Sequence, residues 1–282
     1  MNDVGNIQWF PGHMTKTRRL IEADLKMVDA VVEITDARIP ESSRNPILDE
    51  LVKDKPRIIL MNKCDYADEA ATRAWKQYYE KKGIRVLTCD CRSGKGLNAF
   101  LPDVKRLLAE LIERRKKRGM IGKALRLMVV GIPNVGKSSF INRMAKTKKT
   151  KVGDKPGVTR GKQWVSIDKD VELLDMPGIL WPKFDDQLAA QRLAFTGAIK
   201  DDVMDTEVLA RALGAVLKEQ YQELLNARYK LTGDEDILRD IAKSRGMLVS
   251  GGEPDTERAA AALLDEYRGG KIGRITLEKP GR

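Results

Sequence analysis

A glycine-rich stretch, GIPNVGKS, runs from Gly131 to Ser138 directly after the mostly apolar residues 126–130. Its spacing of two glycines, a lysine and a serine is typical of a loop that cradles nucleotide phosphates between a strand and a helix. Backbone N–H groups of such a loop can hold a β-phosphate at the positive end of the helix. Lys137 would reach the β- and γ-phosphates, and Ser138 would bind Mg²⁺. The alternative is an ordinary glycine-rich turn. We expect these residues to bind nucleotide: Pro133, Asn134, Val135, Gly136, Lys137, Ser138 and Ser139.

Two further segments could complete a phosphate and metal site. DMPG ends a predicted strand, where Asp175 can support Mg²⁺ and the amide of Gly178 can sense the γ-phosphate. Between this segment and the glycine-rich loop lies KPGVT, in which Thr159 offers a hydroxyl or carbonyl to the metal. Each segment by itself is also typical of an ordinary turn or loop. Together with the glycine-rich loop they predict Lys137, Thr159 and Gly178 as catalytic residues and Ser138, Thr159 and Asp175 as Mg²⁺ ligands.

The sequence NKCD, from Asn62 to Asp65, follows the mostly apolar run 57–61. Guanine presents a ring N–H and an exocyclic amine side by side, and the carboxylate of Asp65 can accept from both, whereas adenine lacks this arrangement. A buried carboxylate that the wrong base leaves unpaired can discriminate by roughly 10⁴–10⁵. Asn62 would brace the loop, and the stem of Lys63 would cover the ring. The segment therefore predicts a guanine site.

The next strand-to-loop stretch, TCDCR at 88–92, occupies the place of a second base-contacting element. In GTPases this element is usually Ser-Ala-Lys, so this chain differs from it at the first and third positions. We expect Asp90, Cys91 and Arg92 to fill it, with the amide of Cys91 facing the base carbonyl.

The order of these segments is unusual, because the base-reading aspartate of a Ras-like GTPase lies downstream of the phosphate loop. Here the NKCD segment at 62–65 precedes the phosphate loop at 131–138. Several elements at the right strand ends are not a coincidence, so the sequence predicts a circular permutation. This is physically permissible, because a sheet is assembled in space and chain termini often lie close together.

Apolar patterns predict the elements that position these segments. Continuous apolar runs, typical of a parallel sheet covered on both faces, predict strands at 28–35, 57–61, 84–88, 126–130, 162–167 and 171–175. Residues 36–46 are expected to form a long loop. Helical patterns cover 15–27, 68–82, 101–118 and a segment that begins at Lys137.

Beyond residue 183 the pattern changes. It is helical over 186–229 and 255–268, with a strand only at 273–278. Strands that alternate with helices predict an α/β fold. We therefore expect a circularly permuted Ras-like P-loop GTPase domain at 1–183 and a mainly α-helical domain at 184–282.

Composition limits the class of protein. The 282 residues are 42% hydrophobic and 33% charged, as in ordinary folded proteins. The formal charge of +11 favours a polyanionic partner, because Lys and Arg neutralise phosphates and release counterions; the alternative is merely a basic protein. Three cysteines and one histidine form neither a disulfide framework nor a zinc motif. We see no signal peptide and no apolar run long enough for a bilayer, so we expect a cytoplasmic protein.

Taken together, the motifs resemble those of the bacterial ribosome biogenesis GTPase A family, the circularly permuted GTPases of large-subunit assembly. The resemblance rests on WFPGHM, DARIPESSRNP, NKCD, GIPNVGKSS, PGVT, DMPGILWPKF and TGAIKD, in this order along nearly the whole chain. It implies GTP hydrolysis coupled to late maturation of the large (50S) ribosomal subunit, with the factor bound to the particle in its GTP state and released on hydrolysis. It also implies ribosomal RNA and ribosomal proteins as partners of a monomer, with RNA contacts in the C-terminal domain.

The resemblance also falls on individual residues. Ras-like proteins have a water-orienting glutamine after Asp-x-x-Gly, but here that position is Ile179. In the family the histidine of PGHM is proposed to compensate, which makes His13 a catalytic candidate; the alternative is an imidazole that only packs the N-terminal segment. Asn134 resembles the asparagine through which related GTPases hold K⁺, the alternative being an asparagine that favours a turn.

Competing functions remain at this point. One is an RNA-binding scaffold whose nucleotide is regulatory and whose turnover is negligible, as the loss of glutamine at Ile179 would favour. Another is a GTPase of tRNA modification or ion transport, although the chain has neither a membrane segment nor an extra catalytic domain. The basic run at 113–118 could grip RNA phosphates or form a solvated face.

Overall fold

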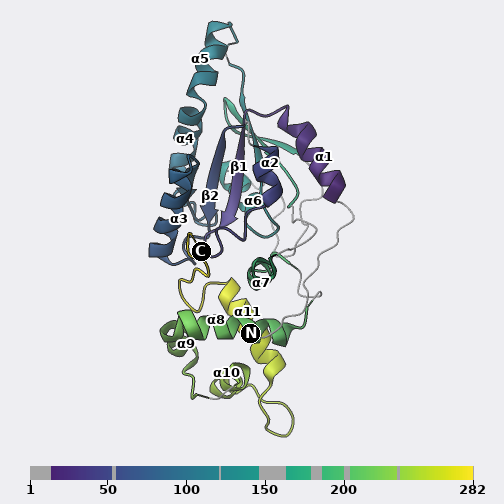
Figure 1. Ribbon diagram of the computed structural model, residues 1–282, viewed down its shortest axis with the longest axis vertical. Coiled ribbons are helices and arrows are strands. Elements are labelled where there is room, and N and C mark those ends of the chain that lie inside the picture. Colours follow the sequence, from purple (N-terminus) through teal and green to yellow (C-terminus); the bar gives the residue numbers. More distant parts are fainter. Residues whose placement is uncertain are drawn as a thin grey trace.

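The computed structural model describes residues 14–52, 55–120, 122–145, 163–178, 186–199, 204–233 and 236–281. In this part of the chain an α/β part with a six-stranded sheet lies beside a helical part (Figure 1). The strand order is β3-β2-β1-β4-β6-β5, and all neighbours are parallel except β5, which pairs antiparallel with β6. The strands are β1 (Ala30–Asp36), β2 (Arg57–Asn62), β3 (Arg85–Thr88), β4 (Leu125–Val130), β5 (Gln163–Asp168) and β6 (Val171–Asp175).

Helices cover both faces of the sheet, which explains why β1 is buried at every position. On one face lie α1 (Met14–Leu25), α2 (Pro46–Leu51) and α3 (Glu69–Lys81). On the other lie α4 (Phe100–Leu107) and α6 (Lys137–Met144), whose phenylalanines Phe100 and Phe140 meet edge to face at 5.0 Å. The carboxyl ends of β1, β2, β3, β4 and β6 therefore open at one edge of the sheet, where ligands bind in α/β folds.

One helix extends beyond these layers. α5 (Ala109–Lys117) follows α4 away from the sheet, and none of its residues is buried (Figure 1). Arg114, Arg115, Lys116 and Lys117 occupy its last turn, where cations suit the negative end of the helix dipole. This helix is therefore a basic projection on the α/β part.

The helical part consists of α7 (Gln187–Phe195), α8 (Thr206–Gln220), α9 (Gln222–Tyr229), α10 (Ile237–Arg245) and α11 (Thr256–Arg268). An aspartate side chain accepts a backbone N–H at the start of four of these helices, which explains where each begins: Asp186, Asp205, Asp236 and Asp255. Leucines and alanines of α8, α10 and α11 form their common core.

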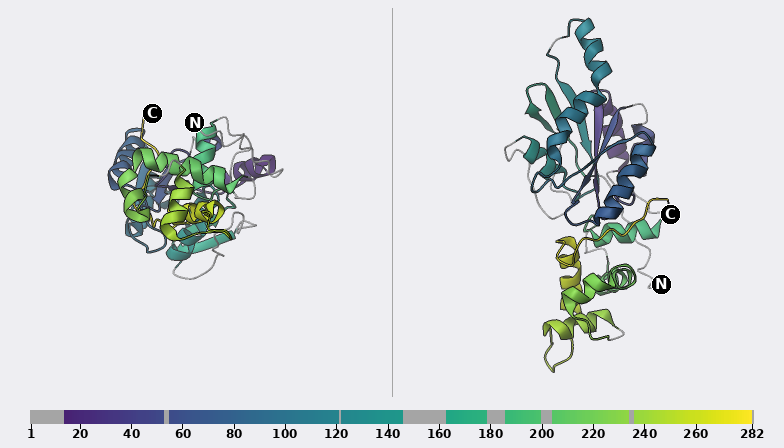
Figure 2. Two further views of the ribbon diagram at one scale, coloured as in Figure 1. Left: turned by 90° about the horizontal axis from the view of Figure 1, so that it is seen from below. Right: turned by 90° about the vertical axis from the view of Figure 1, so that its left-hand side faces the viewer.

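After α11 the chain returns to the α/β part, as Figure 2 shows at its C-terminal end. The amides of Ile275 and Leu277 donate to the carbonyls of Tyr66 and Arg38 at 2.9 and 2.8 Å. Residues 275–278 form what we call the C-terminal strap. The carboxylate of Glu278, at its end, accepts hydrogen bonds from the backbone amides of Glu41 and Ser42.

The predicted α/β class with a helical C-terminal part is confirmed, but details differ. The strand predicted at 273–278 is wrong, because this segment is extended yet pairs with no strand of the described sheet. The helix predicted over 101–118 is interrupted at Leu108. α10 and the short α2, which begins at the Asn45 cap, were not predicted. The boundary between 183 and 184 stays a prediction, although the strap shows that residues beyond it pack on the first part.

No described helix is both long and apolar enough to cross a membrane.

Candidate nucleotide-binding site

The glycine-rich loop joins β4 to α6. Glycine is required at Gly131, because a Cβ there would lie 2.6 Å from the carbonyl oxygen of Ile34. The Nζ of Lys137 donates to the carbonyls of Gly131 and Ile132 at 3.1 and 2.9 Å, so the ammonium group folds over the loop. Burial lowers the pKa of Lys137 to about 8, and the nearby carboxylate of Asp175 opposes this shift. A buried ammonium whose hydrogen-bond partners in the described part of the chain are carbonyls is suited to an anionic ligand.

Asp175 ends β6 and is fully buried. Neither of its carboxylate oxygens has a hydrogen-bond partner among the described residues. Burial raises its pKa to about 6, opposed by Lys137. A buried carboxylate without partners costs free energy unless a ligand satisfies it, and Mg²⁺ prefers oxygen donors of this kind. Together with the Ser138 hydroxyl in the first turn of α6, this donor fits the predicted magnesium site.

Gly178 brings the DMPG segment against the glycine-rich loop. A Cβ at Gly178 would lie 2.9 Å from the Cα of Pro133 and 3.0 Å from the Nζ of Lys137. Only glycine permits this approach. The structure thus places the two predicted phosphate-binding segments, 131–138 and 175–178, side by side.

Replacing Asp175 by asparagine should flatten the pH dependence of stability in nucleotide-free protein without Mg²⁺. Because the folded-state pKa is raised from 3.8 to about 6, the folded protein holds a proton that the unfolded chain releases, so stability falls as pH rises from about 4 to about 6. A shift of this size corresponds to about 3 kcal/mol in full, of which about 2 kcal/mol falls between pH 4 and pH 7.

Urea unfolding in EDTA at pH 4 and pH 7 measures this. We expect the wild-type protein to lose about 2 kcal/mol more than Asp175→Asn over this interval. Equal losses in the two proteins would show that the carboxyl group of Asp175 titrates normally.

Asn62 connects residues 62–65, which we call the base loop, to the glycine-rich loop and to the segment 88–92. Its Nδ2 donates to the carbonyl of Val135 in the glycine-rich loop at 2.7 Å, and its Oδ1 accepts from the amide of Cys91 at 2.9 Å. Gly136 leaves room for this side chain, since a Cβ would lie 2.3 Å from the Nδ2 of Asn62. The structure therefore brings residues 62–65, 88–92 and 131–138 together at the carboxyl edge of the sheet.

Asp65 lies in this loop with one carboxylate oxygen, Oδ1, buried and without a hydrogen-bond partner among the described residues. Burial and the neighbouring charge of Asp90 raise its pKa. Asp90 is different, because its oxygens accept from the amides of Arg92 and Ser93 at 2.7 and 3.1 Å. These bonds outweigh burial and lower the pKa of Asp90. Asp65 is therefore the carboxylate open to a base.

The structure also shows contacts of other predicted site residues. The amide of Cys91 donates to the Oδ1 of Asn62. The guanidinium of Arg92 donates to the Tyr66 hydroxyl at 3.0 Å. Asn134 has a left-handed backbone, with a φ of 56°, and its Nδ2 donates to the carbonyl of Gly197 at 2.8 Å. Ser139 lies in α6 beside Ser138. His13, Thr159 and Ile179 lie outside the described residues.

The sequence reasoning did not identify Asp36 and Arg38 as parts of this site. The Nζ of Lys63 lies 3.0 Å from Asp36, which also binds the guanidinium of Arg38. An available signal was the charged pair of DAR directly after a buried strand, where side chains of a parallel sheet meet the ligand edge.

Known proteins share this arrangement. A family model described as "50S ribosome-binding GTPase" matches residues 126–233. The ribosome biogenesis GTPase A of Bacillus licheniformis is 48% identical over 281 residues, 97% of this chain and 98% of that protein. The chain belongs to the ribosome biogenesis GTPase A family. The enzyme of Bacillus cereus is 44% identical over 278 residues, 97% of this chain and 94% of that protein.

A solved structure agrees with the fold of this GTPase. The crystal structure of GNP-bound YlqF from T. maritima has a TM-score of 0.64 and 30% identity, and covers 94% of this chain and 99% of its own. The predictions of family, fold class and GTPase activity are thereby confirmed. The sequence order of the base and phosphate segments is the circular permutation that the motifs predicted.

Proposed function

We propose that this GTPase is an assembly factor for late maturation of the large (50S) ribosomal subunit. It binds ribosomal RNA and pre-ribosomal particles in the GTP state and leaves them on hydrolysis, as a cytoplasmic monomer. The main support is the convergence of Asp65, Lys137 and Asp175 at one sheet edge, where a half-buried carboxylate, a buried ammonium and a buried carboxylate suit guanine, phosphate and Mg²⁺. The relatives named as ribosome biogenesis GTPases support the ribosomal partner.

The residue roles belong to the same proposal. Asp65, Asn62 and Lys63 recognise the base, and residues 133–139 with Gly178 hold the phosphates. Ser138, Thr159 and Asp175 would hold Mg²⁺, which neutralises charge on the β- and γ-phosphates when bound. Asn134 would hold K⁺. Asn134 would have to bind K⁺ while its Nδ2 donates to the carbonyl of Gly197.

Basic surfaces support an RNA partner. The formal charge is +11, and α5 projects from the GTPase part with no buried residue. Arg114 in this helix and Arg118 at its C-cap form no ion pair among the described residues, so their charges are open to phosphates. The helical part, residues 184–282, is proposed to contact RNA as well.

The central experiment measures GTP turnover with and without purified large subunits, in K⁺ and in Na⁺. We expect slow turnover of the free protein, stimulation by the particle and a higher rate in K⁺. Binding to particles without stimulated turnover would instead favour an RNA-binding scaffold, an alternative for which Ile179 in place of glutamine speaks.

Association with the particle should weaken steeply with salt and depend on GTP. Phosphate contacts release counterions, so the logarithm of the affinity falls linearly with the logarithm of salt concentration. With six such contacts the loss between 50 and 200 mM salt is about 10³-fold. Co-sedimentation at several salt concentrations measures this. Equal binding with GDP and a non-hydrolysable GTP analogue would exclude the nucleotide coupling.

A further inference from the structure

Arg38 is a buried cation between the base loop and the helical part, with 1% of its surface exposed. Its Nε and Nη2 donate to the two carboxylate oxygens of Asp36 at 2.9 and 2.8 Å. Its Nη1 donates to the carbonyls of Tyr267 and Arg268 at 3.1 and 3.2 Å. These carbonyls end α11, where the helix dipole favours a cation. One side chain thus joins the end of β1 to the end of α11.

Asp36 extends this connection into the base loop. Its Oδ2 also lies 3.0 Å from the Nζ of Lys63, whose backbone is left-handed with a φ of 61°. Asp36 is buried, and a buried carboxylate needs all of its partners. If Arg38 were absent, Lys63 would be the only cation left beside Asp36 within the part of the chain that the structure describes. The position of the Lys63 stem, which covers the guanine ring in our proposal, therefore depends on Arg38.

Tyr66 forms a second contact between the base loop and the segment that follows α11. Gly270 lies directly on the Tyr66 ring, where a Cβ would come within 2.5 Å of Cδ1. The amide of Ile275, in the strap, donates to the Tyr66 carbonyl at 2.9 Å. The guanidinium of Arg38 lies 5.9 Å from the centre of the same ring. The Tyr66 end of the loop segment 63–66 therefore rests on the segment that follows α11, and the Lys63 end is connected to α11 through Asp36 and Arg38.

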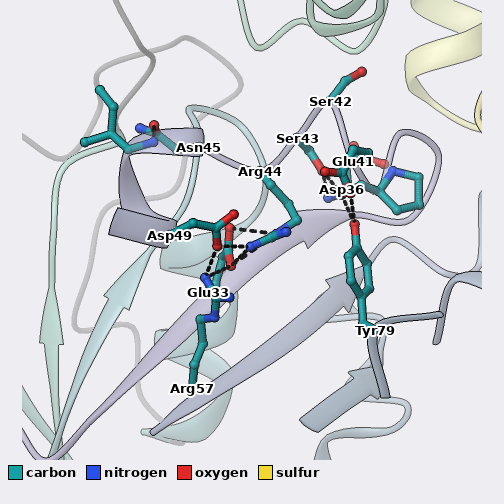
Figure 3. Close-up of polar contacts among 12 residues, drawn as sticks. Glu33, Asp36, Glu41, Ser42, Ser43, Arg44, Asn45, Asp49, Arg57 and Tyr79 are labelled. Carbon is teal, nitrogen blue, oxygen red and sulfur yellow. Dashed lines mark hydrogen bonds and ion pairs between the residues drawn. The ribbon is translucent and has the colours of Figure 1, made fainter. Parts of the chain in front are cut away.

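The loop that follows β1 is fixed by further polar contacts of its residues, which Figure 3 draws around Asp36, Glu41 and Arg44. The Ser43 hydroxyl accepts from the amide of Asp36 at 2.9 Å, and the Tyr79 hydroxyl donates to Glu41 at 2.8 Å. Arg44 pairs with the buried Glu33 of β1. A loop fixed in this way transmits a displacement of α11 to Asp36 and does not absorb it.

We propose that Asp36 and Arg38 are positioning residues of the guanine loop, and that through them nucleotide affinity depends on the docking of α11. A partner that draws α11 away would let Lys63 and Tyr66 shift, so that GDP dissociates faster. By thermodynamic reciprocity, bound nucleotide holds α11 in place. The inference rests on the proposed assignment of residues 62–65 to the guanine base.

The test measures dissociation of fluorescently labelled GDP by stopped flow. Arg38→Gln should release GDP about tenfold faster, within the usual range of coupling between sites. Arg38→Lys keeps a cation beside Asp36, so its rate of GDP release should lie between those of Arg38→Gln and the wild type. Arg73→Gln is the matched control, because Arg73 is an exposed arginine of α3 that pairs only with Glu69 among the described residues. Its GDP release should match the wild type.

Hydrogen exchange tests the reciprocal effect in the unmodified protein. GDP should slow exchange of the amides of Gly269, Gly270 and Lys271, which donate to carbonyls of α11. Arg38→Gln should lose this protection. Normal GDP release by folded Arg38→Gln, or no protection by GDP in the wild type, would overturn the inference.

If Arg38→Gln does not fold, the hydrogen-exchange measurement on the wild-type protein tests the inference by itself. Failure of the proposed function would look different, because the wild-type protein would then bind no GDP at all.

Discussion

Asp65→Asn should change the preferred base from guanine to xanthine. The carboxylate of Asp65 has a buried oxygen that no described residue hydrogen-bonds and a raised pKa, as expected for a group open to two donors. An asparagine amide can accept from the ring N–H and donate to the carbonyl that xanthine has in place of the guanine amine. Two hydrogen bonds to a charged group, at about 1.5–3 kcal/mol each, predict a change of about 10²–10⁴ in the GTP-to-XTP affinity ratio.

Displacement of labelled nucleotide by GTP and by XTP measures this ratio. Asp68→Asn is the matched control, with the same change of charge nearby. Asp68 caps α3 by accepting from the amide of Ala71 at 2.7 Å, and asparagine caps helices equally well. The control should keep the wild-type preference for guanine. Unchanged GTP affinity in Asp65→Asn would remove Asp65 from the base site.

His13→Ala should slow particle-stimulated hydrolysis and leave GTP binding nearly intact. Ile179 cannot orient water, so another group has to do so, and His13 is the only histidine of the chain. We propose that the N-terminal segment moves over the nucleotide on the particle, which places the imidazole beside the attacking water. Loss of this group should lower the stimulated rate by about 10²-fold or more.

Turnover with saturating large subunits, compared with the rate of the free protein, is the measurement. His13→Gln separates two roles, because a glutamine amide can orient water but cannot take up a proton. Both variants should still co-sediment with particles in the GTP state. A wild-type stimulated rate in His13→Ala would make the residue structural and place the hydrolytic group elsewhere.

Much of the site was predictable because its motifs are local. The glycines of GIPNVGKS are dictated by close backbone approaches, which only glycine permits at Gly131 and Gly136. The strands were readable because a sheet covered on both faces needs continuous apolar residues, as in β1. The circular permutation followed from the order of motifs alone, since each motif indicates its own place at a strand end.

What the sequence did not reveal depends on contacts between distant residues. Arg38 binds carbonyls more than 200 positions away, at Tyr267 and Arg268, and no periodicity encodes such a pair. Residues 273–278 have the composition of a strand, but the strap finds its partners in the carbonyls of Tyr66 and Arg38 and not in a neighbouring strand. The hydrogen bond from the Cys91 amide to Asn62 also joins residues 29 positions apart, so no local pattern indicated it, and the role of this amide toward the base stays a prediction.

The helical part is anchored to the GTPase part at both of its ends. Gly197, after α7, accepts a hydrogen bond from Asn134, and the strap beyond α11 lies along Arg38 and Tyr66. A lobe with two attachment points does not swing freely, as a lobe on a single linker can. A single cut in the hairpin at 248–254 would leave both fragments attached, each at a high effective concentration beside its site. Any opening is therefore limited in extent and quickly reversed.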